Sequence, residues 1–178
     1  MNISPKVLWI TRTGIMIALL IVSQAATAPM GNQFITGSIV NLILFVSTMM
    51  FGLTSGLAVA VLSPFLARLF GIGPIFFVII PFISLGNGAL VLVYHFLSGK
   101  ADNIKLRIAG VIAAAVAKFA VLYAGIVMFV APVVLELPPA APVYVMFSFP
   151  QLITALIGGA ISLAMYGPLK KAIEARQV

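Results

Sequence analysis

Cysteine is absent from this chain of 178 residues, and carboxylates and histidine are scarce. Without thiols the chain has no disulfide, no thiolate nucleophile and no thiolate metal site. Three Asp or Glu residues and one His provide neither a carboxylate pair placed for acid/base catalysis nor a histidine pair for a metal. The nucleotide-binding pattern GxxxxGKS/T is also missing. These absences predict a chain that is not an enzyme, binds no metal and holds no cofactor.

Charged residues make up only 7% of the chain, whereas hydrophobic residues make up 63%. About a quarter of the residues in a soluble domain are charged, so this composition is typical of an integral membrane protein. Because one crossing needs about 20 apolar residues, the length allows five or six helices with short connections. No long Gly/Ser linker or clear repeat divides the sequence, which predicts a single membrane domain over residues 1–178.

Six apolar runs predict six transmembrane helices, at about 8–28, 39–51, 57–70, 75–97, 108–130 and 144–166. Residues 30–38 (MGNQFITGS) are expected to form a polar outward loop, and residues 52–56 (GLTSG) a cytoplasmic turn. The Gly86-Asn87-Gly88 sequence is expected to interrupt the fourth helix near its middle, where such a break would line a site.

The basic residues fall on one side of these six helices. Eight Lys and Arg residues lie in segments predicted to be cytoplasmic, and the three outward loops contain none. This distribution follows the positive-inside rule, so we expect a compact all-α bundle of six transmembrane helices with both termini in the cytoplasm. Membrane topology thus explains the formal charge of +7 without a nucleic-acid partner. The eight residues are Lys6, Arg12, Lys100, Lys105, Arg107, Lys170, Lys171 and Arg176.

One of the two remaining basic residues, Lys118, lies deep in the fifth predicted helix, in the sequence AAAVAKFAVLYAG. A lysine at the middle of a bilayer costs roughly 2.5 to 3.5 kcal/mol, and it persists where it faces a cavity, a polar partner or a bound anion. The surrounding alanines and glycine allow close helix packing and leave room next to the ammonium. The structural alternative is a lysine that snorkels or forms a pair, although snorkelling is difficult at this depth.

Several polar residues are candidates for a substrate site with Lys118. Arg68, near the outer end of the third helix, would make the site suited to an anion, unless it snorkels to the outer headgroups instead. Each uncharged candidate alone is better explained by a hydrogen bond between helices, but most share the outer half of the bundle, which favours a common pocket. The uncharged candidates are Asn32, Gln33, Asn41, Asn87, Gln151 and Thr154.

Six stretches of the sequence together resemble a known family of membrane proteins. In order and spacing the chain is similar to the substrate-binding S component of an energy-coupling factor (ECF) vitamin transporter, and the resemblance covers nearly its whole length. The stretches are RTGIMIALLIVSQ, GSIVNLILF, GLTSGLAVAVLSPFLARLFGIGP, IPFISLGNGALVLVYHFL, AAAVAKFAVLY and FPQLITALIGGAISLAMYGPLKK.

The resemblance implies a function and partners. S components capture water-soluble vitamins or related micronutrients at the plasma membrane of prokaryotes, and a transmembrane coupling protein with two ATP-consuming ATPase subunits drives delivery inward. Gly14 and Ala18 occupy the likely position of the family's small-residue motif that docks on the coupling protein, with glycine in place of the first alanine. The loop 30–38 would form part of a lid. Lys118 and Arg68 favour an anionic substrate, such as pantothenate, a folate or a phosphorylated cofactor precursor.

Three other functions are compatible with a small polytopic chain. A self-contained transporter or channel would normally need a carboxylate within the membrane or an internal repeat, and the sequence shows neither. An intramembrane enzyme acting on lipid would need a nucleophile or an acid/base pair, which Lys118 without a carboxylate supports poorly. A structural subunit of another membrane complex would use Lys118 as a subunit contact.

Overall fold

The computed structural model of the protein describes residues 4–98 and 103–175, and every regular element in these ranges is helical. Two short 3-10 helices, η1 (Ala28–Met30) and η2 (Phe77–Ile79), precede α2 and α4, and a π-helical segment, η3 (Tyr123–Val134), continues α5. The all-α prediction is therefore confirmed for this part of the chain. The α-helices are α1 (Pro5–Thr27), α2 (Gln33–Phe51), α3 (Leu53–Leu69), α4 (Ile80–Ser98), α5 (Ile104–Leu122), α6 (Pro142–Met146) and α7 (Phe149–Glu174).

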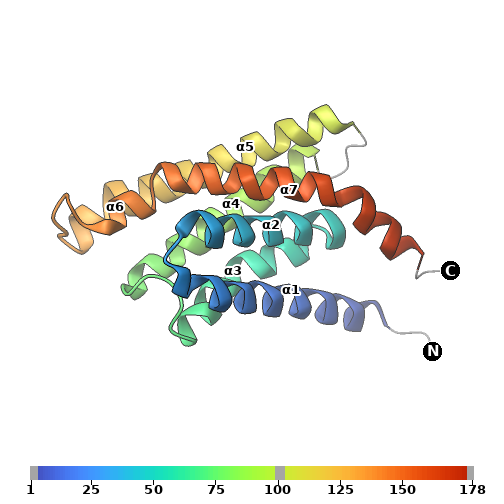
Figure 1. Cartoon of the computed structure of the whole chain (residues 1–178), viewed down its shortest axis with the longest axis horizontal. Coiled ribbons are helices and arrows are strands. Elements are labelled where there is room, and N and C mark those ends of the chain that lie inside the picture. Colours follow the sequence, from blue (N-terminus) through green and yellow to red (C-terminus); the bar gives the residue numbers. More distant parts are fainter. Residues whose placement is uncertain (1–3, 99–102, 176–178) are drawn as a thin grey trace.

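The long helices run back and forth along one common direction (Figure 1). Each long helix runs opposite to the one before it, so the start of α1 and the end of α7 lie at the same end of the bundle. We call this the terminal end. The opposite end, called the far end, holds the connections 28–32, 70–79 and 135–148.

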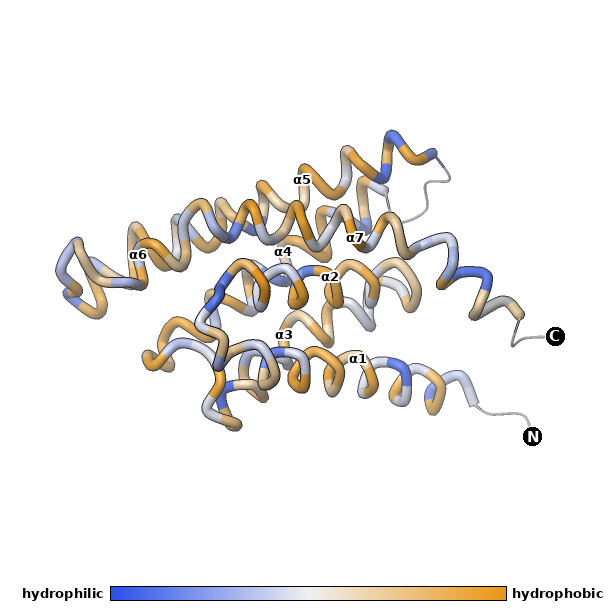
Figure 2. The backbone as a smooth tube through the Cα atoms, viewed as in Figure 1, coloured by the Kyte–Doolittle hydropathy of each residue, from blue (hydrophilic) through white to orange (hydrophobic). Residues whose placement is uncertain are grey.

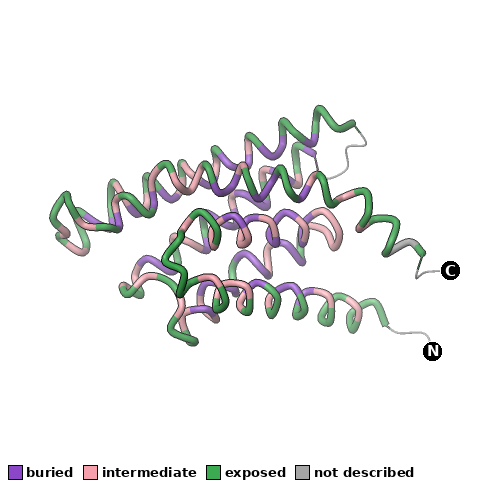
Figure 3. The backbone as a smooth tube through the Cα atoms, in the orientation of Figure 1, coloured by how far each residue is buried: buried purple, intermediate pink, exposed green. Residues whose placement is uncertain are grey.

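Helix length and hydropathy give the bundle the character of a multi-pass membrane protein. Five helical stretches are long and apolar enough to span a membrane, whereas α3, with 17 residues, is apolar but shorter. Apolar residues predominate along the long helices (Figure 2), and exposed positions run along their outer faces (Figure 3). Large side chains such as Leu85, Ile112 and Phe149 are exposed there, which suits a lipid environment. A sixth crossing and the cytoplasmic position of both ends stay predictions.

The segment 30–38, expected to be a loop, is mostly helical. Asn32 caps α2, because its side-chain oxygen accepts hydrogen bonds from the backbone N–H groups of Phe34 (2.9 Å) and Ile35 (3.4 Å). This cap starts the helix at Gln33, six residues earlier than hydropathy alone indicates. The prediction of a nine-residue outward loop was therefore wrong. The GLTSG turn is likewise shorter than expected, since α3 begins at Leu53, directly after Gly52 with its positive φ of 85°.

The predicted interruption of the fourth helix is also wrong, because α4 continues through Gly86, Asn87 and Gly88. Gly86 instead allows close packing between helices, because it has no side chain. A Cβ at Gly86 would lie 2.7 Å from the side chain of Leu122, so the glycine allows α5 to pack close to α4. Asn87 is held in a regular helix and is 1% exposed.

The last two predicted helices differ from the structure at their ends. The fifth begins at Ile104 and continues through η3 to Val134, which makes one helical stretch of 31 residues. The sixth is divided into α6 and α7 at Phe147 and Ser148, and α7 extends to Glu174. Hydropathy indicates which residues suit lipid. It therefore underestimates the length of a helix that continues beyond the bilayer into the polar region.

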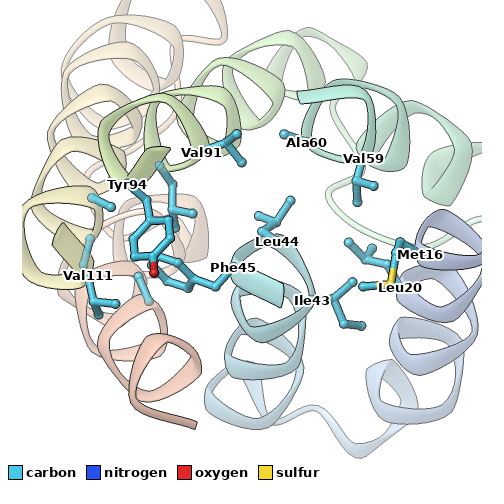
Figure 4. Packing of buried hydrophobic residues seen from close by; sticks show 14 residues of the cluster. Met16, Leu20, Ile43, Leu44, Phe45, Val59, Ala60, Val91, Tyr94 and Val111 are labelled. Atoms are coloured by element: carbon cyan, nitrogen blue, oxygen red, sulfur yellow. The ribbon is translucent and has the colours of Figure 1, made fainter. Parts of the chain in front are cut away.

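The main core lies between the helices, nearer the terminal end than the far end. Its buried side chains come from α1 to α5 and α7 (Figure 4). The rings of Phe45 on α2 and Tyr94 on α4 meet edge to face, with centroids 5.2 Å apart. Both side chains are fully buried. A second cluster, around Leu122, Ile126 and Phe147, packs η3 against α6 at the far end.

Two glycines bring α2 and α7 unusually close together. A Cβ at Gly158 would lie only 2.6 Å from the backbone N of Leu42 and the backbone O of Ser38. A Cβ at Gly37 would lie 3.0 Å from the side chain of Thr154. Since side-chain carbons do not approach backbone atoms so closely, glycine at position 158 sets the distance between the two helices.

We expect Gly158→Ala to destabilise the protein, because the added methyl group must push α7 away from the backbone of α2. Overpacking of this kind costs about 1 to 3 kcal/mol. The measurement is the midpoint of thermal unfolding of the purified chain in detergent. Gly14→Ala is the matched control, since Gly14 is exposed on α1 and nothing lies within 4 Å of a Cβ there. Equal unfolding midpoints for the two variants would contradict the close contact.

Candidate functional site

A cavity of about 360 Å³ lies in the far half of the bundle. The second halves of α1 and α3, the start of α2, the start of α4 and the second half of α5 surround it, and Met146, Phe147 and Gln151 close one side. Its volume is within the range of pockets that hold small organic ligands. Most of its wall is apolar, and Phe147 supplies an aromatic ring. Its polar lining residues are Gln24, Asn32, Gln33, Thr36, Ser63, Asn87, Lys118 and Gln151.

Lys118 is the charged residue of this cavity. It lies near the middle of the helical stretch Ile104–Val134 and is only 3% exposed. Its ammonium donates a hydrogen bond of 2.7 Å to the side-chain oxygen of Asn41. No carboxylate lines the cavity, and none forms a salt bridge with Lys118 within residues 4–98 and 103–175. The site therefore contains one positive charge that a neutral amide partly stabilises.

Asn41 connects Lys118 to α7 through a short series of hydrogen bonds. Its side-chain nitrogen donates to the carbonyl of Gly37 (2.8 Å) and to the hydroxyl of Thr154 (3.3 Å). The Thr154 hydroxyl in turn donates to the carbonyl of Gln151 (3.2 Å). These bonds fix the Asn41 amide with its oxygen toward Lys118, because its nitrogen already has two acceptors. Asn41 and Thr154 therefore lie behind the cavity wall and orient the lysine.

A lysine ammonium has three N–H donors, and Asn41 accepts from one of them. In the described part of the chain, no other residue accepts a hydrogen bond from Lys118. In its protonated form Lys118 therefore keeps two donors for a molecule in the cavity. A carboxylate or phosphate oxygen is the complementary group, since hydrogen bonds between ionised partners are about twice as strong as neutral ones.

Two of the amides that line the cavity belong to Gln24 on α1 and Asn87 on α4. The side-chain oxygen of each is buried and has no hydrogen-bond partner among the described residues. Buried polar atoms are normally hydrogen-bonded, so an unmatched amide next to a cavity indicates a missing partner. A hydrogen-bond donor is the complementary group for either oxygen.

At the mouth of the cavity, Gln33 and Gln151 both donate to the backbone carbonyl of Met146. The bond from Gln151 is 3.0 Å long. Thr36 on α2 also donates to the hydroxyl of Thr27 at the end of α1 (3.0 Å). These contacts join the ends of α1, α2 and α6 around the opening, so the polar mouth holds together elements distant in sequence.

The structure thus brings together most of the residues predicted for a substrate site. Lys118, Asn32, Gln33, Asn87 and Gln151 line the cavity, and Asn41 and Thr154 lie directly behind Lys118. Arg68 is not among the lining residues.

Arg68 instead donates a hydrogen bond of 3.1 Å to the backbone carbonyl of Ile75, in the connection that follows α3. This contact draws the guanidinium toward the far-end loop. The cavity therefore has one basic side chain in its wall, although the sequence suggested two.

Thr36, Ser63 and Gln24 also line the cavity, although they were not among the predicted site residues. A serine or threonine in an apolar helix commonly bonds its own backbone, so neither residue type identifies a site by itself. Gln24 carried a usable signal, because an amide within an apolar helix needs a partner.

A second candidate surface lies on the outer face of α1. Gly14 and Ala18 are one helical turn apart and both are exposed. Buried positions follow the opposite face at Thr13, Met16 and Leu20. The exposed pair thus offers a smooth strip of small residues, as the predicted docking on a membrane partner requires.

Comparison with protein-family models, with curated proteins and with solved structures finds no match to this chain. The functional argument therefore rests on the geometry of the cavity and of α1.

The Lys118 to Asn41 contact can be tested by stability. Asn41→Leu should lower the unfolding midpoint in detergent, because it leaves a buried ammonium without its acceptor, at a cost of about 1 to 3 kcal/mol. Adding Lys118→Met should recover part of this loss, since the unpaired charge is then removed. Ser47→Ala on the same helix is the control, because the buried Ser47 hydroxyl has no partner in the described region. Strictly additive effects of the two substitutions would contradict the coupling.

Proposed function

We propose that this chain is the membrane-embedded substrate-binding subunit, or S component, of an ECF-type importer. It captures a water-soluble vitamin or related micronutrient from outside, with a preference for an anionic one. A transmembrane coupling protein and two ATPase subunits then drive delivery inward, and ATP is consumed by these partners. The chain spans the plasma membrane of a prokaryote six times, with both termini in the cytoplasm.

The observation that carries this proposal is a buried lysine facing a cavity of vitamin size inside an apolar helical bundle. Ionisable residues within membrane segments are functional by default, because a structural role rarely repays their desolvation. The cavity is enclosed by several helices, contains no carboxylate and leaves two ammonium donors unused. These features suit capture of a small anion.

Partner binding is supported by the exposed Gly14 and Ala18 on α1. The chain has no nucleotide-binding pattern of its own, so an energised import cycle needs ATPase partners. Asn32 and Gln33 line the cavity and belong to segment 30–38, which in this proposal forms part of a lid over the substrate. These roles follow from the sequence resemblance and belong to the same proposal.

The main alternative is a structural subunit of another membrane complex. In that case the bond from Lys118 to Asn41 would serve helix packing alone. The unmatched oxygens of Asn87 and Gln24 belong to residues that line the cavity, which favours a ligand over a purely structural role. A self-contained transporter would need a carboxylate for ion coupling, and none of the cavity-lining residues provides one.

The first test is to purify the chain alone in detergent, denature it and identify released small molecules by mass spectrometry. We expect a stoichiometric vitamin-like anion, which can then be used to measure affinity. Lys118→Met should weaken its binding tenfold or more, because the charge-assisted hydrogen bonds are lost.

Arg68→Gln is the matched control for that experiment. It removes the other basic residue that was predicted to lie in the site. Because the Arg68 side chain bonds the Ile75 carbonyl and does not line the cavity, affinity should change less than twofold. If Lys118→Met binds the released compound as tightly as the unchanged chain, Lys118 is not a ligand contact. If no compound is released and no ATPase copurifies from cells, the structural alternative is favoured.

Docking can be tested separately from binding. Gly14→Leu or Ala18→Leu should abolish copurification with the coupling protein, because a large side chain disrupts close helix contact. Retention of the small molecule should be unchanged, since both residues lie outside the cavity wall. Ala26→Leu, at an exposed α1 position nearer the far end, serves as control. Normal assembly of the Gly14 and Ala18 variants would show that the partner docks elsewhere.

A further inference from the structure

The cavity wall carries a single charged side chain. Among the described residues that line the cavity, Lys118 is the only charged one. Arg68 bonds the Ile75 carbonyl and is not part of the wall, and Glu136, at the far end, does not line the cavity either. The other polar lining residues carry amides or hydroxyls, which stay neutral at physiological pH. A bound solute therefore meets one positive charge and otherwise neutral polar groups.

The number of charges in the wall limits the number of charges on the solute. A charged group in an apolar site is strongly destabilised unless an opposite charge pairs with it. One carboxylate of the solute can pair with Lys118, but a second anionic group or an ammonium group would have no counterion in the wall. The cavity therefore disfavours dicarboxylates, doubly charged phosphate esters and zwitterions. It also disfavours cations, because Lys118 repels them.

The positions of the polar groups indicate which end of the solute enters first. Lys118 lies near the middle of the helical stretch Ile104–Val134, whereas Gln33 and Gln151 lie at the mouth. The unmatched amides of Gln24 and Asn87 suit hydroxyl or amide groups, because such groups both donate and accept hydrogen bonds. The carboxylate thus lies deepest, next to Lys118, and the neutral polar groups follow toward the mouth.

We propose that the substrate is a small monocarboxylic acid that binds carboxylate first and whose remaining polar groups are neutral hydroxyls or amides. This inference rests on the proposed function and narrows its substrate class. Of the anions that the sequence suggested, it retains pantothenate, and it excludes folates and phosphorylated precursors, which carry more than one negative charge. The cavity volume of about 360 Å³ is consistent with a small acid, since it is near the lower end of the range for ligand pockets.

The test uses the full chain in detergent. The compound that denaturation releases should contain one carboxylate and no phosphate or amine, as determined by accurate mass and fragmentation. Three pairs of probes then separate charge from shape, because only the first member of each pair carries a carboxylate. The pairs are pantothenate and pantothenol, nicotinate and nicotinamide, and biotin and biotin amide. The acid of at least one pair should raise the midpoint of thermal unfolding, and its neutral partner should bind about tenfold more weakly or worse.

A charge added to the wall tests the same limit from the side of the protein. Asn87→Asp introduces a carboxylate with almost no change in size, so it should weaken binding of the acid about tenfold or more by repulsion and by competition for Lys118. Asn103→Asp is the matched control, because Asn103 is exposed at the start of α5 and does not line the cavity. If Asn87→Asp does not fold, Gln24→Glu makes the same test at a less buried position of the wall.

The outcomes distinguish this inference from the proposed function. A released compound with no charge, with two or more charged groups or with an amine would overturn the single-carboxylate assignment and leave substrate binding standing. Unchanged affinity of the folded Asn87→Asp or Gln24→Glu variant would also overturn it. If nothing is released, the probe pairs decide, and stabilisation by none of the three acids counts against the inference. The proposed function itself fails only if no compound is released or bound and no ATPase copurifies.

Discussion

The hydrogen bond between the Lys118 ammonium and the Asn41 amide is the interaction on which the candidate site depends. A charge in the middle of an apolar bundle requires an acceptor, and Asn41 provides one at 2.7 Å. The close packing of α2 and α7 at Gly158 brings the Thr154 hydroxyl within reach of the Asn41 nitrogen, from which the Gly37 carbonyl also accepts a hydrogen bond. A glycine without a side chain thus helps to orient the partner of the lysine.

The bundle separates support from binding along its length. Toward the terminal end, large side chains such as Phe45 and Tyr94 fill the space between the helices (Figure 4). Toward the far end, the space between the helices remains open as the cavity, and a second cluster around Leu122, Ile126 and Phe147 packs η3 against α6. A tightly packed half resists deformation, so it fixes the helix positions that define the open half. Lys118 lies where these two regions meet.

The sequence predicted the centre of the site better than its borders. Lys118 was recognisable because a lone charge in an apolar run has few physical explanations. The start of α2 was not, because one capping hydrogen bond from Asn32 outweighed the polarity of the segment. Glycines at positions 86 and 88 are compatible with either a helix break or close helix packing. Only the position of Leu122 next to Gly86 shows that packing is the reason. The position of Arg68 depended on a loop carbonyl that no periodicity predicts.

The two faces of α1 place the cavity and the proposed docking surface on one helix. Leu20 and Gln24 line the cavity, while Gly14 and Ala18 face outward. At its terminal end, α1 is held to α3 by two side-chain hydrogen bonds, from Trp9 to Thr54 and between Thr13 and Ser55. A partner docked on the outer face would therefore act on the helix that forms the cavity wall. Thr36 bonds Thr27 at the far end of α1, and Met16 and Leu20 pack into the main core, so a shift of α1 would be transmitted to both the cavity and the core.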